Sequence, residues 1–407
     1  MREPMKVEID SAALADAVAW TTRVIDARPA SPILAGIQLE AIDGTLQLSA
    51  FNYEISARHH IEAGIDEPGT ALVLGKLLAD ITKSLPAEKT YLSTDGSTMT
   101  INSGKSTFTM QLMPDAEYPD LPVVPAKLGQ VDAPTFIQAV TQASVAVSRE
   151  ENRPVLTGVR MQFDGDKVTM TSTDRFRLSR ATFTWTPQNI DTSTTTLVRG
   201  SLLRDVARAL DDHQNVVIDF DADNPTLLGF ENAGRVSTSQ LIDGEFPAVD
   251  RLFADEYPIQ AVIDKQLLIA AIKRVALVAE RNAPIRMVFS GQEVTLSAGA
   301  VDEAQAQEML DIDMDGEDIT VAFNPSYLIE GLSAITEPFV RMKMTTAVKP
   351  VEFNGQQEAD SARRSALSSA RYSRWLTASI SRPSQKTGTE FPSRVNVRTV
   401  KSSGEPT

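Results

Sequence analysis

The residues that most often carry out chemistry in proteins are scarce in this 407-residue chain. It contains no cysteine and only three histidines, His59, His60 and His213. The lack of cysteine excludes disulfides, thiol nucleophiles and thiolate zinc sites. His59 and His60 are adjacent, so on a strand their side chains would point to opposite faces, and we expect them to be surface residues rather than metal ligands.

Three short motifs resemble ligand sites but lack residues that the chemistry needs. Residues 104–106 read Gly-Lys-Ser, like the end of a phosphate-binding loop, but Met99 stands where that loop requires glycine and a strand is expected to follow. Residues 311–316 open like a calcium loop, but Ala322 occupies the position of the bidentate acid. The acids within 219–223 have no glycine after them. We therefore predict turns here, with no metal and no cofactor.

The composition and charge narrow the class of protein. The chain is 42% hydrophobic and 23% charged, it begins without a signal peptide, and no stretch approaches the roughly 20 apolar residues of a membrane span. We therefore predict a cytoplasmic, multidomain protein with no membrane partner. A formal net charge of −15 argues at first against nucleic acid, because non-specific DNA binding rests on Lys and Arg that meet phosphates.

A repeated helical pattern is the strongest signal in the sequence. In three places an Asp that could cap a helix precedes a stripe of apolar or small residues with the spacing of one helical face. The three sets are Asp10, Leu14, Ala17, Val18, Thr21 and Ile25; Asp132, Phe136, Ala139, Val140, Ala143 and Val147; and Asp264, Leu268, Ala271, Ile272, Val275 and Ala279. Three α+β domains that share a stripe by chance are the alternative, but we favour a true repeat because the cap, the stripe, the turn and a second helix recur in the same order.

Each of these helices is followed by a proline-marked turn, a predicted hairpin and a second helix. The prolines are Pro32, Pro154 and Pro284, and the second helices begin near Gly75, Gly200 and, with a looser match, Pro325. The period is about 125 residues, which is the size of a domain. We therefore predict an α+β protein of three similar domains, 1–127, 128–253 and 254–360, each with two helices on one face of an antiparallel sheet of about eight strands.

Four longer motifs resemble the bacterial DNA polymerase III beta subunit, the replicative sliding clamp. They are Arg-Pro-Ala-Ser-Pro-Ile-Leu at 28–34, Thr-Asp-Arg-Phe-Arg-Leu at 173–178, Leu-Ile-Asp-Gly-Glu-Phe-Pro at 241–247 and Phe-Asn-Pro-Ser-Tyr at 323–327. The resemblance covers residues 5 to about 355. It implies the DNA-clamp fold and a head-to-tail homodimer that forms a ring of six domains, with helices lining the hole.

This ring offers an answer to the acidic net charge. A basic inner wall would attract phosphates while the acidic exterior repels DNA, since screening acts over about 8 Å. Basic residues recur on or beside the predicted helices at Arg23, Arg28, Lys76, Lys83, Arg199, Arg204, Arg208, Lys265, Lys273 and Arg274. For duplex DNA the residues we select are Arg28, Lys76, Arg149, Arg199 and Arg208. Phosphate contacts carry no sequence information, so such a ring could slide.

The resemblance also implies two protein interfaces. A groove between the second and third domains would bind short peptides of the polymerase alpha subunit, the clamp loader and repair proteins. The matching positions are Leu156, Thr173, Arg175, Phe176, Arg177, Leu178, Pro247, Arg251, Leu252, Val348 and Pro350, with apolar walls and an arginine rim. The homodimer would join Lys105 and Phe108 of domain one to Leu277, Val278 and Glu303 of domain three.

The chain departs from the family beyond residue 360. Residues 361–407 hold nine Lys or Arg against two Glu, are rich in Ser and Thr, and lack the usual apolar strand with its Met-Pro-x-Arg ending. We predict a disordered tail and a third domain without its terminal strand, which puts peptide binding in question. A shifted reading frame is the explanation we favour, and a genuine basic tail is the alternative.

Two other functions stay open at this stage. No Ser-His-Asp set, nucleophile elbow or zinc signature is present, but paired carboxylates of a metal-dependent hydrolase cannot be identified from spacing. An adaptor of three repeats that never meets DNA has the same sequence signature. The function we predict is a non-catalytic clamp that encircles DNA.

Overall fold

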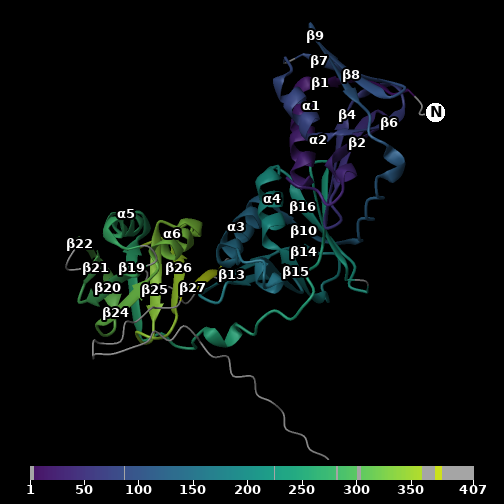
Figure 1. The fold of residues 1–407 in the computed structure, drawn as a ribbon. Coiled ribbons are helices and arrows are strands. Elements are labelled where there is room, and N and C mark those ends of the chain that lie inside the picture. The colour runs from purple at the N-terminus through teal and green to yellow at the C-terminus, as the bar shows by residue number, and fades with distance from the viewer. Residues whose placement is uncertain are drawn as a thin grey trace, which may run out of the picture.

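The computed structural model describes residues 4–86, 88–223, 225–280, 283–299, 304–359 and 372–377. Within these residues one order of elements occurs three times, each time with two α-helices and nine strands. Figure 1 shows the three repeats as an open arc whose concave side is lined by the helices. The predicted α+β class and threefold repeat are confirmed.

The first repeat begins with a strand that leads directly into a capped helix. Its elements are β1 (Lys6–Asp10), α1 (Ser11–Thr21), β2 (Gly36–Ile42), β3 (Thr45–Phe51), β4 (Ile55–Glu62), β5 (Gly64–Glu67), β6 (Gly69–Leu74), α2 (Gly75–Ser84), β7 (Lys89–Asp95), β8 (Thr98–Ser103) and β9 (Ser106–Gln111). The Asp10 carboxylate accepts the backbone N–H groups of Ala12 and Ala13 at 3.0 and 2.9 Å, which satisfies donors that the first turn leaves unpaired.

The second repeat follows the same plan. Its elements are β10 (Lys127–Asp132), α3 (Ala133–Ala143), β11 (Gly158–Asp164), β12 (Lys167–Thr173), β13 (Arg177–Thr184), β14 (Thr186–Pro187), β15 (Ser193–Arg199), α4 (Gly200–Ala209), β16 (Asn215–Phe220), β17 (Leu227–Asn232) and β18 (Arg235–Gln240). Asp132 caps α3 through the N–H of Thr135 at 2.9 Å. Gly75 and Gly200 open the second helices because a Cβ there would lie 2.4 Å from Ile25 and 2.6 Å from Val147.

The third repeat keeps the plan with different residues at the caps. Its elements are β19 (Ile259–Asp264), α5 (Lys265–Val275), β20 (Ile285–Ser290), β21 (Glu293–Gly299), β22 (Gln305–Asp311), β23 (Asp313–Asp315), β24 (Ile319–Phe323), α6 (Pro325–Ala334), β25 (Phe339–Met344), β26 (Val351–Gln356) and β27 (Tyr372–Thr377). Asp264 accepts the N–H of Leu267 at 2.9 Å, and Asn324 accepts that of Ser326 at 2.9 Å. The three predicted Asp caps are therefore confirmed.

Each repeat has its own hydrophobic core between the helices and the sheets. Leu14 and Val18 of α1 pack against Leu39 and Leu48 in the first, while Phe136 of α3 lies against Phe230 in the second. The predicted helical stripes are the faces that enter these cores. The opposite faces of the helices stay available on the concave side.

The described residues form four sheets, and two of these continue from one repeat into the next. One has the order β14-β10-β16-β17-β18-β4-β3-β2-β6, and the other β15-β11-β12-β13-β27-β26-β25-β19-β23. The repeats are joined where β4 pairs with β18 and where β13 pairs with β27, both antiparallel. At each junction the fourth strand of one repeat meets the ninth strand of the following repeat.

The prediction that the third repeat lacks its terminal strand is wrong. The backbone of β27 pairs with β26 on one side and with β13 on the other. The sequence of residues 372–377 shows no clear strand pattern, but two open strand edges offer it hydrogen-bond partners. The remainder of the predicted disordered tail lies outside the described residues, and the domain boundaries near 127 and 253 stay predictions.

The prediction that both adjacent histidines lie on the surface is wrong for His59. Its side chain is buried at the first junction, where its ring meets that of Trp20 at 5.5 Å, whereas His60 is exposed. Burial, followed by the nearby Arg235 charge, lowers the pKa of His59 to about 4. Among the described residues, no helix is long and apolar enough to cross a membrane.

Candidate functional sites

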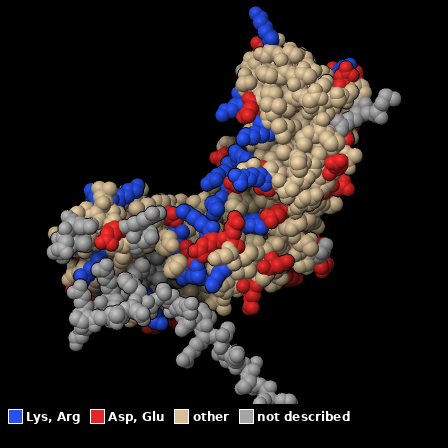
Figure 2. All heavy atoms as spheres, viewed as in Figure 1, with Lys and Arg blue, Asp and Glu red and all other residues tan. Residues whose placement is uncertain are grey.

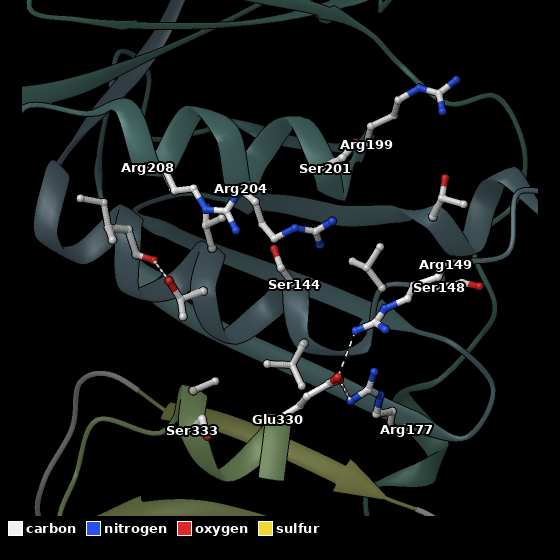
Figure 3. Close-up of a pocket in the computed structure, with 18 of the residues that line it drawn as sticks. Ser144, Ser148, Arg149, Arg177, Arg199, Ser201, Arg204, Arg208, Glu330 and Ser333 are labelled. Carbon is white, nitrogen blue, oxygen red and sulfur yellow. Dashed lines mark hydrogen bonds and ion pairs between the residues drawn. The ribbon is translucent and has the colours of Figure 1, made fainter. Parts of the chain in front are cut away.

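Basic side chains gather along the concave side of the arc, and acidic side chains are frequent on the convex side (Figure 2). A cleft of about 850 Å³ lies on the concave side, where α3 and α4 face α6 of the next repeat. Five arginines line it, as Figure 3 shows: Arg149, Arg177, Arg199, Arg204 and Arg208. Arg149, Arg199 and Arg208 were predicted to bind DNA, Arg204 was predicted only as a residue of the basic wall, and Arg177 was predicted for the peptide groove.

The amphipathic helix α4 explains why its arginines face the cleft. Leu203 and Val206 are buried in the core, so Arg204 and Arg208 lie on the opposite face of α4. Arg208 pairs with Asp205 at 3.4 Å. Among the described residues no carboxylate pairs with Arg204, and burial lowers its pKa from the ordinary arginine value. A half-buried guanidinium that lacks a carboxylate partner is suited to receive an anion.

The cleft arginines Arg199 and Arg149 are held by acids from neighbouring repeats. Arg199 pairs with Glu54 of the first repeat at 2.9 Å. Arg149, in the segment after α3, pairs with Glu330 of α6 at 3.0 Å (Figure 3). Both arginines therefore lie at junctions. They line the concave surface and also form ion pairs between repeats.

The first repeat carries the two remaining residues predicted for DNA. Arg28 is exposed in the loop that follows α1, and Lys76 is exposed on the first turn of α2. They lie outside the arginine cleft. Lys265, which the sequence placed in the basic wall, is buried instead, and its Nζ donates to the backbone carbonyl of Ile335 at 2.6 Å. It serves the packing of the third repeat.

The predicted peptide groove divides into buried and exposed residues. Leu156 and Leu178 are buried, and Leu178 packs with Val249 in a small cluster that also contains Phe246 and Phe253. The large apolar residues left exposed are Phe176, Leu252 and Val348, with 54%, 46% and 69% of their surface accessible. The three exposed residues can anchor a ligand, whereas Leu156 and Leu178 belong to the packed interior.

The segment between β12 and β13 is held in an unusual conformation. Arg175 has a φ of 81°, which is rare for a residue with a side chain. Its guanidinium pairs with Glu150 at 3.1 Å, and the buried Thr173 donates its hydroxyl to the carbonyl of Arg177 at 2.8 Å. The ring of Phe176 lies 6.3 Å from that of Tyr327 in α6. This segment therefore touches the third repeat.

Arg177 is buried rather than on the rim that the sequence indicated. It donates to Asp174 at 2.9 Å and to Glu330 at 2.6 Å, and it lies 4.3 Å from the centre of the Tyr327 ring. Three partners from two repeats fix its position. The sequence could not show this burial, because Glu330 is 153 residues away along the chain.

The two sides of the predicted groove are separated by a strand. Val348 and Pro350 lie between β25 and β26, and β27 stands between β26 and β13 of the second repeat. The exposed Arg251 lies in the short 3-10 helix Asp250–Leu252, and Pro247 precedes it in the same connecting segment. Sequence reasoning missed Arg180, which pairs with Asp250 and lies 4.3 Å from the Phe253 ring centre.

The two ends of the arc each present an unpaired strand edge among the described residues. In the first repeat the sheet order is β5-β1-β7-β8-β9, which leaves β9 at the edge, with Lys105 in the turn before it and Phe108 on it. In the third repeat the order is β22-β21-β20-β24, which leaves β22 at the edge. Near it Leu277 is 83% exposed, and Val278 is partly buried. Glu303 lies outside the described residues.

Comparison with known proteins gives one consistent result. The N-terminal, central and C-terminal domains of the DNA polymerase III beta subunit match residues 5–122, 130–248 and 250–366. A beta sliding clamp of Streptomyces coelicolor is 44% identical over 358 residues, which are 88% of this chain and 95% of that protein. The beta sliding clamp of Micrococcus luteus is 41% identical over 75% of this chain and 98% of its own.

Solved structures show the same fold at lower identity. The sliding clamp of Bacillus subtilis has a TM-score of 0.84 at 23% identity and covers 93% of this chain and 100% of its own. The Pseudomonas aeruginosa clamp bound to griselimycin has a TM-score of 0.82 at 21% identity, with 93% and 99% covered.

Proposed function

Because the chain belongs to the DNA polymerase III beta subunit family, we propose that two copies close head to tail around duplex DNA and hold other proteins there. The chain is a DNA sliding clamp, a non-catalytic processivity factor rather than an enzyme. Its partners are double-stranded DNA, a second copy, the polymerase alpha subunit, the clamp loader and repair proteins, and we place it in the cytoplasm.

The proposal of ring closure rests on the way in which strands join the repeats. At both internal junctions the fourth strand of one repeat pairs with the ninth strand of the next. The third repeat has its fourth strand, β22, at a sheet edge, and the first repeat has its ninth strand, β9, at an edge. Pairing of β22 with β9 of a second copy applies the same rule again. Two such contacts close a ring of six repeats.

The internal pairing also predicts the register of this contact. At the first junction Ala57 of β4 faces Ser237 of β18. When the hairpins of the repeats are superposed, Ala57 corresponds to Ala306 and Ser237 to Phe108. Phe108 should therefore face Ala306 of the partner subunit.

Exposed apolar residues at the two ends correspond to residues that are covered at the internal junctions. Leu77 of α2 is 44% exposed, whereas its equivalent in α4, Leu202, is 5% exposed at the first junction. Leu277 is 83% exposed, whereas its equivalent, Val145, packs against the core of the third repeat. Burial of such residues in a dimer would remove apolar surface from water.

Light scattering of matched variants tests ring closure. We expect the wild type to have twice the 44.2 kDa of one chain, and Leu277→Asp to have the mass of a single chain, because a carboxylate cannot be buried there. Ile190→Asp is the control, since Ile190 is 64% exposed in the loop between β14 and β15, away from both edges. A dimeric Leu277→Asp variant, or a wild type that is monomeric, would contradict the proposed contact.

The arginine cleft, with Arg28 and Lys76, is the proposed inner wall toward DNA. Phosphate contacts from these side chains give weak, salt-dependent and sequence-independent binding, so retention depends on the closed ring. With a clamp loader and ATP supplied, the protein should stay on circular DNA and leave linear DNA through its ends. Equal loss from both would indicate an adaptor or another function.

The surface that carries the exposed Phe176 and Leu252, with Val348 on the far side of β27, is the proposed site for partner peptides. These exposed apolar side chains can take an aromatic or leucine anchor. Since a clamp of the same fold binds griselimycin, that compound is a suitable probe. Leu252→Ser should weaken its binding at least tenfold in a fluorescence titration, and unchanged binding would place the site elsewhere.

A further inference from the structure

One carboxylate at the second junction contacts an arginine of each proposed site. Glu330 of α6 accepts Arg149 on one oxygen at 3.0 Å and Arg177 on the other at 2.6 Å (Figure 3). Both arginines line the cleft that faces the centre of the arc, and Arg177 also belongs to the segment 173–178, which was predicted for the peptide groove. Glu330 therefore links an exposed arginine of the cleft to a buried arginine of that segment.

The two arginines differ in their freedom to leave this carboxylate. The side chain of Arg177 is 5% exposed and is also held by Asp174 and by the ring of Tyr327. The side chain of Arg149 is 86% exposed and lies at the rim of the cleft. An exposed ion pair contributes little, so a phosphate can compete for Arg149 while Arg177 stays in place.

The electrostatics of the cleft favour that exchange. Arg204 and Arg208 line the same cleft as Arg149, and Arg204 has no carboxylate partner among the described residues. A phosphate drawn to these guanidinium groups lies beside Glu330, and like charges repel. Its arrival therefore draws Arg149 away and pushes the Glu330 carboxylate toward Arg177.

A further ion pair connects the segment after α3 with the segment between β12 and β13. Glu150, next to Arg149, accepts Arg175 at 3.1 Å, and Arg175 has the strained φ of 81°. The segment after α3 is thus tied to the segment between β12 and β13 directly by this pair, and indirectly through Glu330 of α6. A change at Arg149 is transmitted to residues that define the groove.

We propose that Glu330 is a positioning residue that couples the two sites, so that duplex DNA in the ring strengthens peptide binding in the groove. This inference rests on the proposed function of both sites. With Glu330 committed to Arg177, the segment 173–178 is held more firmly before the ligand arrives, and binding loses less conformational entropy. Coupling between two sites is reciprocal, so a bound peptide strengthens DNA binding by the same factor.

The test measures the affinity of the full-length dimer for labelled griselimycin by fluorescence polarisation, with and without a saturating short DNA duplex at low salt. For the wild type we expect binding about threefold to fivefold tighter with DNA, which is the range that one or two partly exposed ion pairs can supply. For Glu330→Gln we expect a ratio near one. Arg149→Gln should give the same result, and the double variant should add nothing further.

Glu337→Gln is the matched control, because it removes one acid just beyond the end of α6 and should keep the wild-type ratio. A variant that merely loosens the junction would bind more weakly in both conditions and leave the ratio unchanged. The coupling is overturned if DNA does not strengthen griselimycin binding to the wild type, or if DNA strengthens binding to Glu330→Gln as much as to the wild type. If the wild type binds neither griselimycin nor duplex, the proposed function fails together with it.

Discussion

The two internal junctions have the same backbone connection and different side chains. At the first, between β4 and β18, the buried rings of Trp20 and His59 meet at 5.5 Å, and Arg235 reaches Asp16 at 2.6 Å and the carbonyl of Ala209. At the second, between β13 and β27, Glu330 joins Arg149 and Arg177, and Gln138 donates to Thr336 at 3.1 Å. The first has a buried aromatic centre, with the ion pairs of Arg235 and Arg199 beside it, and the second is ionic and partly exposed.

The difference indicates which parts of the arc are structural and which can respond to ligands. Backbone pairing between strands sets the position of each repeat at both junctions. The side chains at a junction can therefore differ between the two, and can bind ligands, without a change in how the repeats are joined. The buried centre of the first junction, formed by Trp20 and His59, should respond to pH and little to salt. The ionic second junction, which lies beside the arginine cleft and the groove, should respond to salt and to anions.

Removal of β27, at the second junction, should cause the largest loss of unfolding free energy. A chain that ends at residue 359 loses the strand that joins the second and third repeats, and unpaired backbone groups remain on β13 and β26. At about 1 kcal/mol for each hydrogen bond, we expect a loss on the order of 5 kcal/mol in urea unfolding. A chain that ends at residue 377 is the control, and equal stability of the two would contradict the strand.

Trp20→Ala should have the next largest effect, at the first junction. Trp20 is 8% exposed and packs with Ala57 and Ala209 across the repeats, so its truncation leaves a cavity. We expect a loss of about 3–5 kcal/mol in urea unfolding that is the same at low and high salt. Trp20→Phe should lose less, and a strongly salt-dependent loss would show that the junction is ionic.

The titration of His59 should give an effect of similar or smaller size. Its pKa is about 4 in the folded chain, against an ordinary value of 6.5, so the folded state favours the neutral ring. The stabilisation is complete above pH 6.5 and is lost as the pH falls to 4, by about 3 kcal/mol in total.

The measurement for His59 is the difference in unfolding free energy between the wild type and His59→Gln as a function of pH. A difference is needed because burial raises the pKa of Asp219 to about 7, and its titration acts in the opposite direction. A pH-independent difference would show that His59 is not buried as a neutral ring.

Arg149→Gln should have the smallest effect, at the second junction. Its pair with Glu330 is exposed, so we expect the free energy of unfolding in urea to fall by less than about 1 kcal/mol, and this difference should disappear at 1 M salt. Lys167→Gln, at the exposed start of β12, is the control for charge alone. A loss above 2 kcal/mol that survives salt would place Arg149 among the structural residues.

The elements of each repeat could be predicted from local spacing. The caps at Asp10, Asp132 and Asp264 and the apolar stripes after them depend on contacts three or four residues apart, and the structure has helices at all three. The repeat then predicted the fold class, since a helix with one apolar face must pack on another layer.

The candidate sites could be predicted only in part. Sequence reasoning selected Arg149, Arg199 and Arg208, which do line one cleft, but it placed Arg177 on a rim and Lys265 on the inner wall, and both are buried. It also omitted Glu330, because an acid on a helix face carries no signal until the opposite repeat is known.

What the sequence determined by itself is the repeated unit, its two capped helices and the basic character of their exposed faces. The tertiary structure decided the junctions: the burial of His59, the pairing of β27, and the contacts of Glu330. The reason is distance along the chain. Arg149 and Glu330 are 181 residues apart, and Asp16 and Arg235 are 219 apart, so no local pattern of residues can encode their contact.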